Sequence, residues 1–314
     1  MRLRQFPLCA MFAVSVFSIS LTGSFEKARA QRAGAAATAR DVAVFAVTRR
    51  ADAAFEFEPI TIFRRGAFAG SITGESSAAE LTRFANSYYK AGQRYRLIWG
   101  GAEAGTLIAK QSQKASDCAK AAATADVQTS VQLGGNRMAL ATDSAALGLS
   151  KSSRRAPTDA ERAGVREHVE RIFREKGVPA DALAALQTIN LTATDLNADG
   201  TAELIGTYMI KRGTELLDQL FLIAEPSGNA FKVGLANYAL LKGEDMMSPE
   251  AFESVGQSAF MTEILIDQLD VDKDGTGEVF TISYSFEGTN YAVYKKGAKG
   301  WTRVQEFYNY RCAY

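Results

Sequence analysis

Hydrophobic and polar residues alternate along most of the chain after residue 40, and this pattern predicts a strand-rich protein. The segments 41–47 (DVAVFAV) and 55–63 (FEFEPITIF) are typical of strands, and the glycine in RRGAF predicts a turn after the second. Glycine pairs at 100–101 and 134–135 interrupt two further alternating stretches. We therefore expect a hairpin around each pair.

Two segments show the period of an amphipathic helix instead. Each opens with a capping box, in which a hydroxyl residue precedes a glutamate by three positions: Ser77 with Glu80, and Thr158 with Glu161. The apolar residues of each segment share one face: Leu81, Phe84 and Tyr88 in the first, and Val165, Val169, Ile172 and Phe173 in the second. We expect helices over 77–91 and from 158 to the glycine at 177, a short helix from Pro179 to about Gln187, and a helical turn at SPEAFES.

From about Ile189 to the end, the chain repeats one arrangement of predicted strands. Turns at KRGTE and PSGN separate the strands of the first run, and turns at EGTN and GAKG separate those of the second. When the strand that leads into each run is added, each unit is predicted to hold four antiparallel strands.

An acidic loop lies at the same place in both units, TDLNADGTAE at 194–203 and LDVDKDGTGE at 269–278. Corresponding residues are 75 positions apart (195 to 270). The pairs are Asp195 with Asp270, Asn197 with Asp272, Asp199 with Asp274, Gly200 with Gly275, Thr201 with Thr276, and Glu203 with Glu278.

This spacing suits a hard cation. Acidic or amide side chains at positions 1, 3 and 5 turn inward, and glycine at position 6 permits the reversal that lets the carbonyl at position 7 follow. Ca²⁺ takes six to eight oxygens at about 2.3–2.6 Å, and the glutamate at position 9 would complete that shell. An EF-hand is excluded, because its glutamate comes at position 12, where these loops have Gly206 and Thr281, and because strand patterns follow both loops.

The pattern D-x-[DN]-x-D-G-x-x-E before a strand resembles the calcium loops of the FG-GAP/VCBS repeat family, which includes the integrin alpha-chain propeller. The resemblance implies that each loop joins two antiparallel strands and holds Ca²⁺ structurally. It covers only the part from about Ile189 onward. The ligands that it implies are Asp195, Asn197, Asp199, Thr201 (through its carbonyl) and Glu203, and likewise Asp270, Asp272, Asp274, Thr276 and Glu278.

This chain departs from the family in two ways. Position 9 is glutamate where aspartate is commoner, and two units are too few to close a propeller, so we expect a two-unit sheet or sandwich. A metal-free turn is the alternative reading, because Asp and Asn bond the local backbone and glycine tolerates positive φ. Four acceptor groups within nine residues repel one another without a cation, which favours the metal. Asn197 lowers the charge of the first loop, so the second is expected to be the better site.

The N-terminus has the pattern of a secretory signal peptide. Arg2 and Arg4 precede an apolar run from Leu8 to Leu21, and Ala28 and Ala30 fit a cleavage site after Ala30. Cleavage removes four basic residues and one acidic residue from the 36 and 35 of the chain, leaving 32 and 34, a net charge of −2. This balance gives no reason to expect a nucleic-acid partner, and no later segment could span a bilayer.

Two cysteines, Cys118 and Cys312, remain after cleavage. Export would expose them to an oxidising compartment, where one disulfide between them is the simplest outcome. Two separate buried thiols are the alternative.

The sequence contains few residues or motifs that indicate a catalytic site. The chain has one histidine, His168, which is expected to be an ordinary residue beside the apolar stripe of its helix. Nucleophile and phosphate-loop motifs do not occur. The arginine pairs at 49–50, 64–65 and 154–155 are interpreted as solvated turns. The aromatic residues near the C-terminus are either a stacking platform for a sugar or peptide or the two faces of a packed strand, and we favour the packed strand; they are Trp301, Phe307, Tyr308, Tyr310 and Tyr314.

The sequence therefore predicts a mainly β protein with a few helices (α+β), with antiparallel four-stranded repeat units in its C-terminal half and a strand-rich N-terminal domain. The expected division is 1–30 signal peptide, 31–40 disordered start, 41–150 N-terminal domain, 151–157 linker, 158–188 helical segment and 189–314 repeat units. The leading functional hypothesis is a secreted or periplasmic calcium-binding β-repeat protein, non-enzymatic, with a protein or carbohydrate partner at the cell envelope. The alternatives are a carboxylate-based envelope hydrolase with structural calcium, and an inhibitor or accessory subunit.

Overall fold

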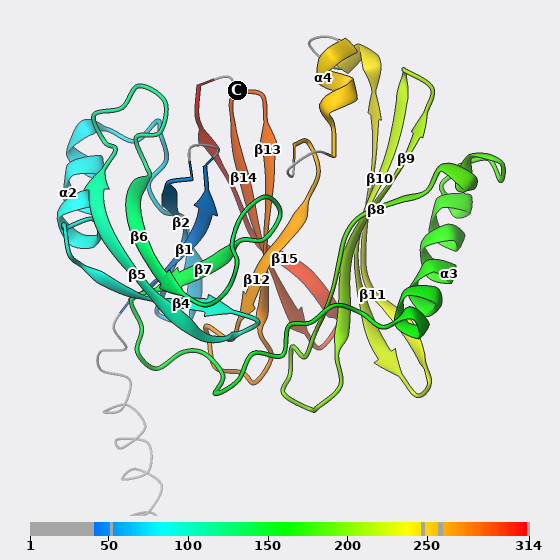
Figure 1. Cartoon of the computed structure of the whole chain (residues 1–314), viewed down its shortest axis with the longest axis horizontal. Helices are drawn as coiled ribbons and strands as arrows, with labels where there is room; N and C mark the ends of the chain where they lie inside the picture. The colour runs from blue at the N-terminus through cyan, green and yellow to red at the C-terminus, as the bar shows by residue number, and fades with distance from the viewer. Residues whose placement is uncertain (1–40, 51–52, 246–248, 257–259, 313–314) are drawn as a thin grey trace, which may run out of the picture. The chain divides into compact units, whose positions relative to one another are not determined.

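The strands predicted from alternation form three antiparallel sheets in a computed structural model that describes residues 41–50, 53–245, 249–256 and 260–312 (Figure 1). Asp41–Tyr314 form one compact unit. The predicted signal peptide (1–30) and disordered start (31–40) lie outside the described residues. The mainly β fold predicted from the sequence is confirmed, with a barrel-like first sheet and two four-stranded sheets in the C-terminal half.

The first sheet closes on itself. Its strands are β1 (Val42–Arg49), β2 (Phe55–Arg64), β3 (Ala67–Ala69), β4 (Arg94–Trp99), β5 (Ala102–Ser112), β6 (Ala123–Thr129) and β7 (Ala139–Thr142). Their order is β1-β7-β4-β5-β6-β2-β3, and β1 also pairs with β2. Phe45 and Val47 of β1 pack inside this barrel, while Val44 and Ala46 pack outside it against a neighbouring sheet. Both faces of β1 are therefore buried, which explains its continuous apolar run.

The hairpin predicted around Gly134–Gly135 is wrong as a strand pairing. β6 pairs with β5 and β2, whereas β7 pairs with β1 and β4. Only Gly134 and Arg137 pair within the connecting loop. Alternation identifies strands but does not choose their partners, and barrel closure gives each of these strands two other neighbours.

The two predicted repeat units are two separate four-stranded meanders. The first contains β8 (Gln187–Thr194), β9 (Glu203–Arg212), β10 (Leu216–Ser227) and β11 (Ala230–Lys242). The second contains β12 (Ile264–Leu269), β13 (Glu278–Ser285), β14 (Gly288–Gly297) and β15 (Gly300–Tyr310). Neighbouring strands are sequential in both sheets, so each pair is joined by a short turn or loop.

The sheets stack in layers with a separate apolar core at each contact (Figure 1). Ile205 and Ile223 of the first repeat sheet pack against Val279 and Tyr294 of the second. Phe280 and its neighbours on the opposite face of the second sheet pack against the outside of the barrel. The expected two-unit sandwich is thus present, and the barrel adds a further layer.

The predicted helices cover the two ends of this stack. α2 (Ala78–Tyr88) packs Phe84 into the barrel core, and α3 (Asp159–Glu175) packs Val165 and Phe173 on the first repeat sheet. Both capping boxes are formed, although α2 ends at Tyr88 and not at residue 91. The short helix predicted after Pro179 is the 3-10 turn η1 (Ala182–Ala185), and α4 (Pro249–Ser254), preceded by η2 (Gly243–Asp245), is the predicted helical turn.

A disulfide joins Cys118 to Cys312, 194 residues apart. It connects the segment between β5 and β6 of the barrel to the residues that follow β15. The pairing favoured from the sequence is therefore confirmed over two separate thiols. None of the helices among the described residues is long and apolar enough to cross a membrane.

Candidate functional site

The two acidic loops occupy the same place in two sheets of the same topology. The first loop (residues 195–203) joins β8 to β9, and the second loop (residues 270–278) joins β12 to β13. In each case, the loop connects the first two strands of a meander and ends with the glutamate that opens the second strand. The predicted repeat therefore extends from the sequence to the arrangement of strands.

The backbone of the two loops is also repeated. Gly200 and Gly275 have φ of 88° and 92°, a region that glycine enters without steric cost. Two residues before each glycine, Ala198 and Lys273 also take positive φ, 56° and 62°. Non-glycine residues seldom adopt this conformation, so its occurrence at matching positions shows that the two loops share one backbone geometry.

One set of hydrogen bonds holds both loops. Gly200 N–H donates to Asp195 Oδ2 at 2.8 Å, and Gly275 N–H donates to Asp270 Oδ2 at 3.1 Å. The N–H at position 5 donates to the other oxygen of the same carboxylate in both loops, at 3.2 and 3.1 Å. The first aspartate therefore organises the turn through the backbone.

The remaining predicted residues also repeat their contacts. Thr201 N–H donates to Asp199 at 2.8 Å, and Thr276 N–H donates to Asp274 at 2.9 Å. The closing glutamate reaches back to the N–H at position 2 in both loops, at 2.9 Å: Leu196 to Glu203, and Val271 to Glu278. Each glutamate is buried, and this places its carboxylate beneath the loop and not in solvent.

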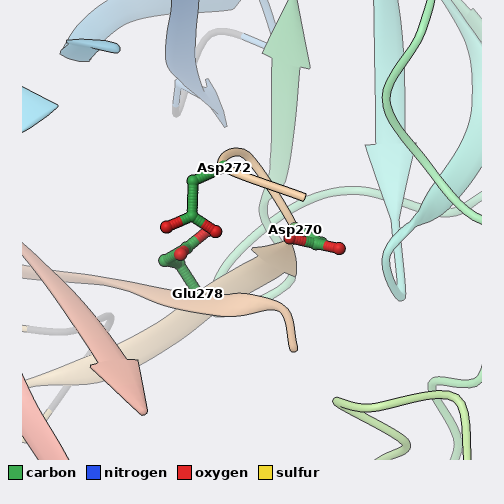
Figure 2. A group of neighbouring side chains, drawn as sticks. All are labelled: Asp270, Asp272 and Glu278. Carbon is green, nitrogen blue, oxygen red and sulfur yellow. The ribbon is translucent and has the colours of Figure 1, made fainter. Parts of the chain in front are cut away.

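In the second loop, three carboxylates converge. One oxygen of each of Asp270, Asp272 and Glu278 lies within 4.8 Å of the others. Figure 2 shows Asp272 and Glu278 directing their carboxylates toward each other, with Asp270 beside them. Carboxylate oxygens at this separation are a donor set that suits a hard cation.

An ammonium group meets these carboxylates. Nζ of Lys295, on β14, donates to Asp272 and Asp274 and lies 3.3 Å from Glu278 Oε1. The lysine thus supplies one positive charge to a loop with four acidic residues. The spacing of the loop residues gives no sign of this contact, because Lys295 lies in another strand and becomes a neighbour only through the β13–β14 register.

The first loop lacks this lysine. Leu204 pairs with Ala224, and Val279 pairs with Tyr294, so the position of Lys295 corresponds to Glu225 in the first sheet. Glu225 binds Lys296 at 2.7 Å and Lys232 at 3.1 Å. Asn197 Nδ2 donates to Asp199 at 2.9 Å, so the first loop orders its acids partly through this amide.

Burial sets the ionisation of the closing glutamates. It raises the pKa of Glu278 to about 7, despite the opposing effects of Val271 N–H and Lys295. It also raises the pKa of Glu203, and that of Asp270. Burial would raise the pKa of Asp274 too, but hydrogen bonds from Lys295 and Thr276 outweigh it and lower the pKa. A cation near Glu278 would favour its ionised form.

Arg154 corrects the expectation of a solvated arginine turn at 154–155. Its side chain is only 8% exposed, its guanidinium lies 4.0 Å from the centre of the Trp99 ring, and it donates to the Ile266 carbonyl at 2.7 Å. Arg155, in contrast, is half exposed and binds Glu161 of the α3 capping box at 2.6 Å. Packing between the barrel and the second repeat sheet buries Arg154, and no local signal marks this.

The other candidates hold ordinary structural positions. His168 Nε2 lies 2.7 Å from the Phe231 carbonyl on the neighbouring sheet, as expected for a residue beside the apolar stripe. Trp301 is buried, Phe307 stacks on Tyr291, and Tyr308 and Tyr310 are exposed. Tyr314 lies outside the described residues.

Comparison with protein-family models, with curated proteins and with solved structures finds no match to this chain, so the geometry of the loops carries the functional argument alone.

Proposed function

We propose that this chain is an exported calcium-binding β-repeat protein whose two acidic loops hold Ca²⁺ structurally. The single observation that carries the proposal is the repetition of one loop geometry, with its acidic side chains, at the same point of two meanders. A turn needs only one Asx residue to form, whereas these loops each place four acceptor side chains around one glycine. The role of such a module is binding or structural support.

Lys295 determines how the two loops would differ. Ca²⁺ in the second loop has to displace the Lys295 ammonium from Asp272 and Asp274. The ammonium already neutralises part of the negative charge of the four acidic residues, and this reduces their attraction for the ion. The first loop has one acid fewer, but no lysine among the described residues binds its carboxylates directly. We therefore infer that the larger negative charge of the second loop does not by itself make it the stronger calcium site, because Lys295 lowers its affinity for Ca²⁺.

Export is part of the proposal. The N-terminal pattern of basic, apolar and small residues supports it, as does the disulfide, since disulfides persist in oxidising compartments. A secreted or periplasmic protein also encounters free calcium at concentrations that fill weak structural sites.

Titration calorimetry on the chelator-treated mature protein tests the calcium assignment. We expect two bound Ca²⁺ per chain, with Asp199→Ala removing one and Asp274→Ala removing the other. Asp117→Ala is the matched control, since Asp117 is exposed and has no side-chain partner among the described residues. If millimolar Ca²⁺ binds to neither loop, or binds equally to all three variants, the assignment fails.

A further inference from the structure

Apart from the acidic loops, a cavity of about 520 Å³ opens beside Trp99 and Arg154. The loop between β6 and β7, residues 154–156 and β8 contribute most of its lining. Its size is in the range of pockets that hold small molecules. We call it the arginine cleft, defined by Trp99, Arg137, Arg154, Arg155, Asn190 and Thr192.

The charge of the arginine cleft has one sign. Three arginines line it, and none of its lining residues is acidic. Arg154 has Asp267 at 3.7 Å behind it, and Arg155 has Glu161 at 2.6 Å. The Arg137 side chain has no hydrogen-bond or ion-pair partner among the described residues, so one of the three positive charges is unpaired.

Arg137 and Arg154 influence each other across this space. Burial lowers the pKa of Arg154, Asp267 opposes that effect, and the charge of Arg137 lowers the pKa further. Two guanidinium groups that repel each other across a cavity are stabilised by an anion between them. Arg154 is also held rigidly by Trp99 and the Ile266 carbonyl, so its orientation costs little when a ligand arrives.

The uncharged polar lining indicates which kind of anion would fit. Gln132, Asn136 and Asn190 contribute amides, and Thr192 contributes a hydroxyl. Oδ1 of Asn136 and Oδ1 of Asn190 are buried without a donor among the described residues. Both oxygens are closed off from solvent and lie behind the surface of the cavity, and Asn190 Nδ2 already donates to Thr207 Oγ1 at 3.2 Å. The amides of Gln132 and Asn136 and the hydroxyl of Thr192 are therefore the uncharged polar groups left to a ligand.

We propose that the arginine cleft binds a small hydroxylated oxyanion, such as a sugar acid or sugar phosphate. The planar guanidinium forks of Arg137 and Arg154 match a carboxylate or a phosphate in geometry and charge. Gln132, the Asn136 amide N–H and Thr192 contact the hydroxyl groups of the same ligand. Arg155 borders the site and links it to the start of α3 through Glu161.

Calorimetry with four probes tests this proposal: glucuronate, glucose 1-phosphate, inorganic phosphate and neutral glucose. We expect one or both charged sugars to bind more tightly than glucose. Binding of glucuronate alone identifies a carboxylate site, and binding of glucose 1-phosphate alone identifies a phosphate site. A site that takes inorganic phosphate as tightly as either charged sugar contradicts the role given to the hydroxyl groups, and absence of binding by both charged sugars overturns the proposal.

Arg137→Gln locates the site. It removes the unpaired charge and keeps most of the side-chain length, and we expect affinity for the charged sugar to fall roughly tenfold or more. Arg94→Gln is the matched control, because it changes the net charge by the same amount. Arg94 is exposed and has no side-chain partner among the described residues. Equal affinities in the two variants, with melting temperatures unchanged, would place the binding elsewhere and refute the assignment.

Discussion

Replacing Lys295 with methionine tests the view that its ammonium takes the place of a cation in the second loop. The substitution keeps the apolar stem and most of the length of the side chain but removes its charge. Asp272, Asp274 and Glu278 then lose a common partner. In metal-free buffer the variant should be less stable, because the three carboxylates are left to repel one another.

The size of the loss follows from the exposure of the partners. Glu278 is fully buried, whereas Lys295 is 26% exposed and Asp274 is 39% exposed. Breaking a fully buried ion pair costs about 3–5 kcal/mol, and an exposed pair contributes about 0–1 kcal/mol. The intermediate burial suggests a loss of about 1–3 kcal/mol. Glu278 can limit the loss by taking up a proton, because burial already raises its pKa to about 7.

The assay is thermal unfolding with EDTA and with Ca²⁺, monitored by circular dichroism. A loss of 1 kcal/mol lowers the melting temperature of a chain of this size by roughly 2 °C, so Lys295→Met should melt about 2–6 °C lower in EDTA. Saturating Ca²⁺ should raise its melting temperature more than that of the unmodified protein, because the ion no longer competes with an ammonium. A site held at about 100 times its Kd gains about 2.7 kcal/mol.

Lys299→Met is the control, since Lys299 is exposed in the turn before β15 and has no side-chain partner among the described residues. The prediction is refuted if Lys295→Met and Lys299→Met have the same melting temperature in EDTA. It is also refuted if Ca²⁺ raises the melting temperatures of both variants by the same amount, because the Lys295 ammonium and the ion would then not compete for the same carboxylates.

Two further predictions concern the framework around the loops. Cys118→Ser with Cys312→Ser opens a loop of 194 residues and should lower the free energy of unfolding in urea by up to about 4–5 kcal/mol relative to the disulfide-intact protein. The reduced protein is the control, because it should show the same loss without any substitution. The second prediction concerns Asp267, which pairs with Arg154. Burial raises the pKa of Asp267 to about 6 in the native protein, so between about pH 4 and 6 its carboxyl is protonated in the native state and ionised in the unfolded chain. Its contribution to stability therefore falls as pH rises through that window, by about 3 kcal/mol at most, and Asp267→Asn should remove this slope from urea curves recorded at several pH values. A slope that persists unchanged in Asp267→Asn would assign it to other groups.

The sequence by itself determined the local features of this protein. Alternation with period two placed the strands of both repeats, and the Ser77 and Thr158 capping boxes placed the starts of both main helices, because such signals depend on neighbours within a few residues. The loop geometry was predictable for the same reason, since aspartate at position 1 and glycine at position 6 act on the turn that contains them. Cys118 and Cys312 were identifiable as partners only by elimination.

Tertiary structure decided everything that depends on contacts between distant segments. Barrel closure chose different partners for β6 and β7 from the hairpin that their glycines suggested. The β13–β14 register brought Lys295 to the second loop, while the same position of the first sheet holds Glu225. Packing of the second repeat sheet against the barrel buried Arg154 on Trp99. Pairing register and packing depend on the free energy of the whole fold. A short stretch of sequence therefore does not determine which distant residue it will contact.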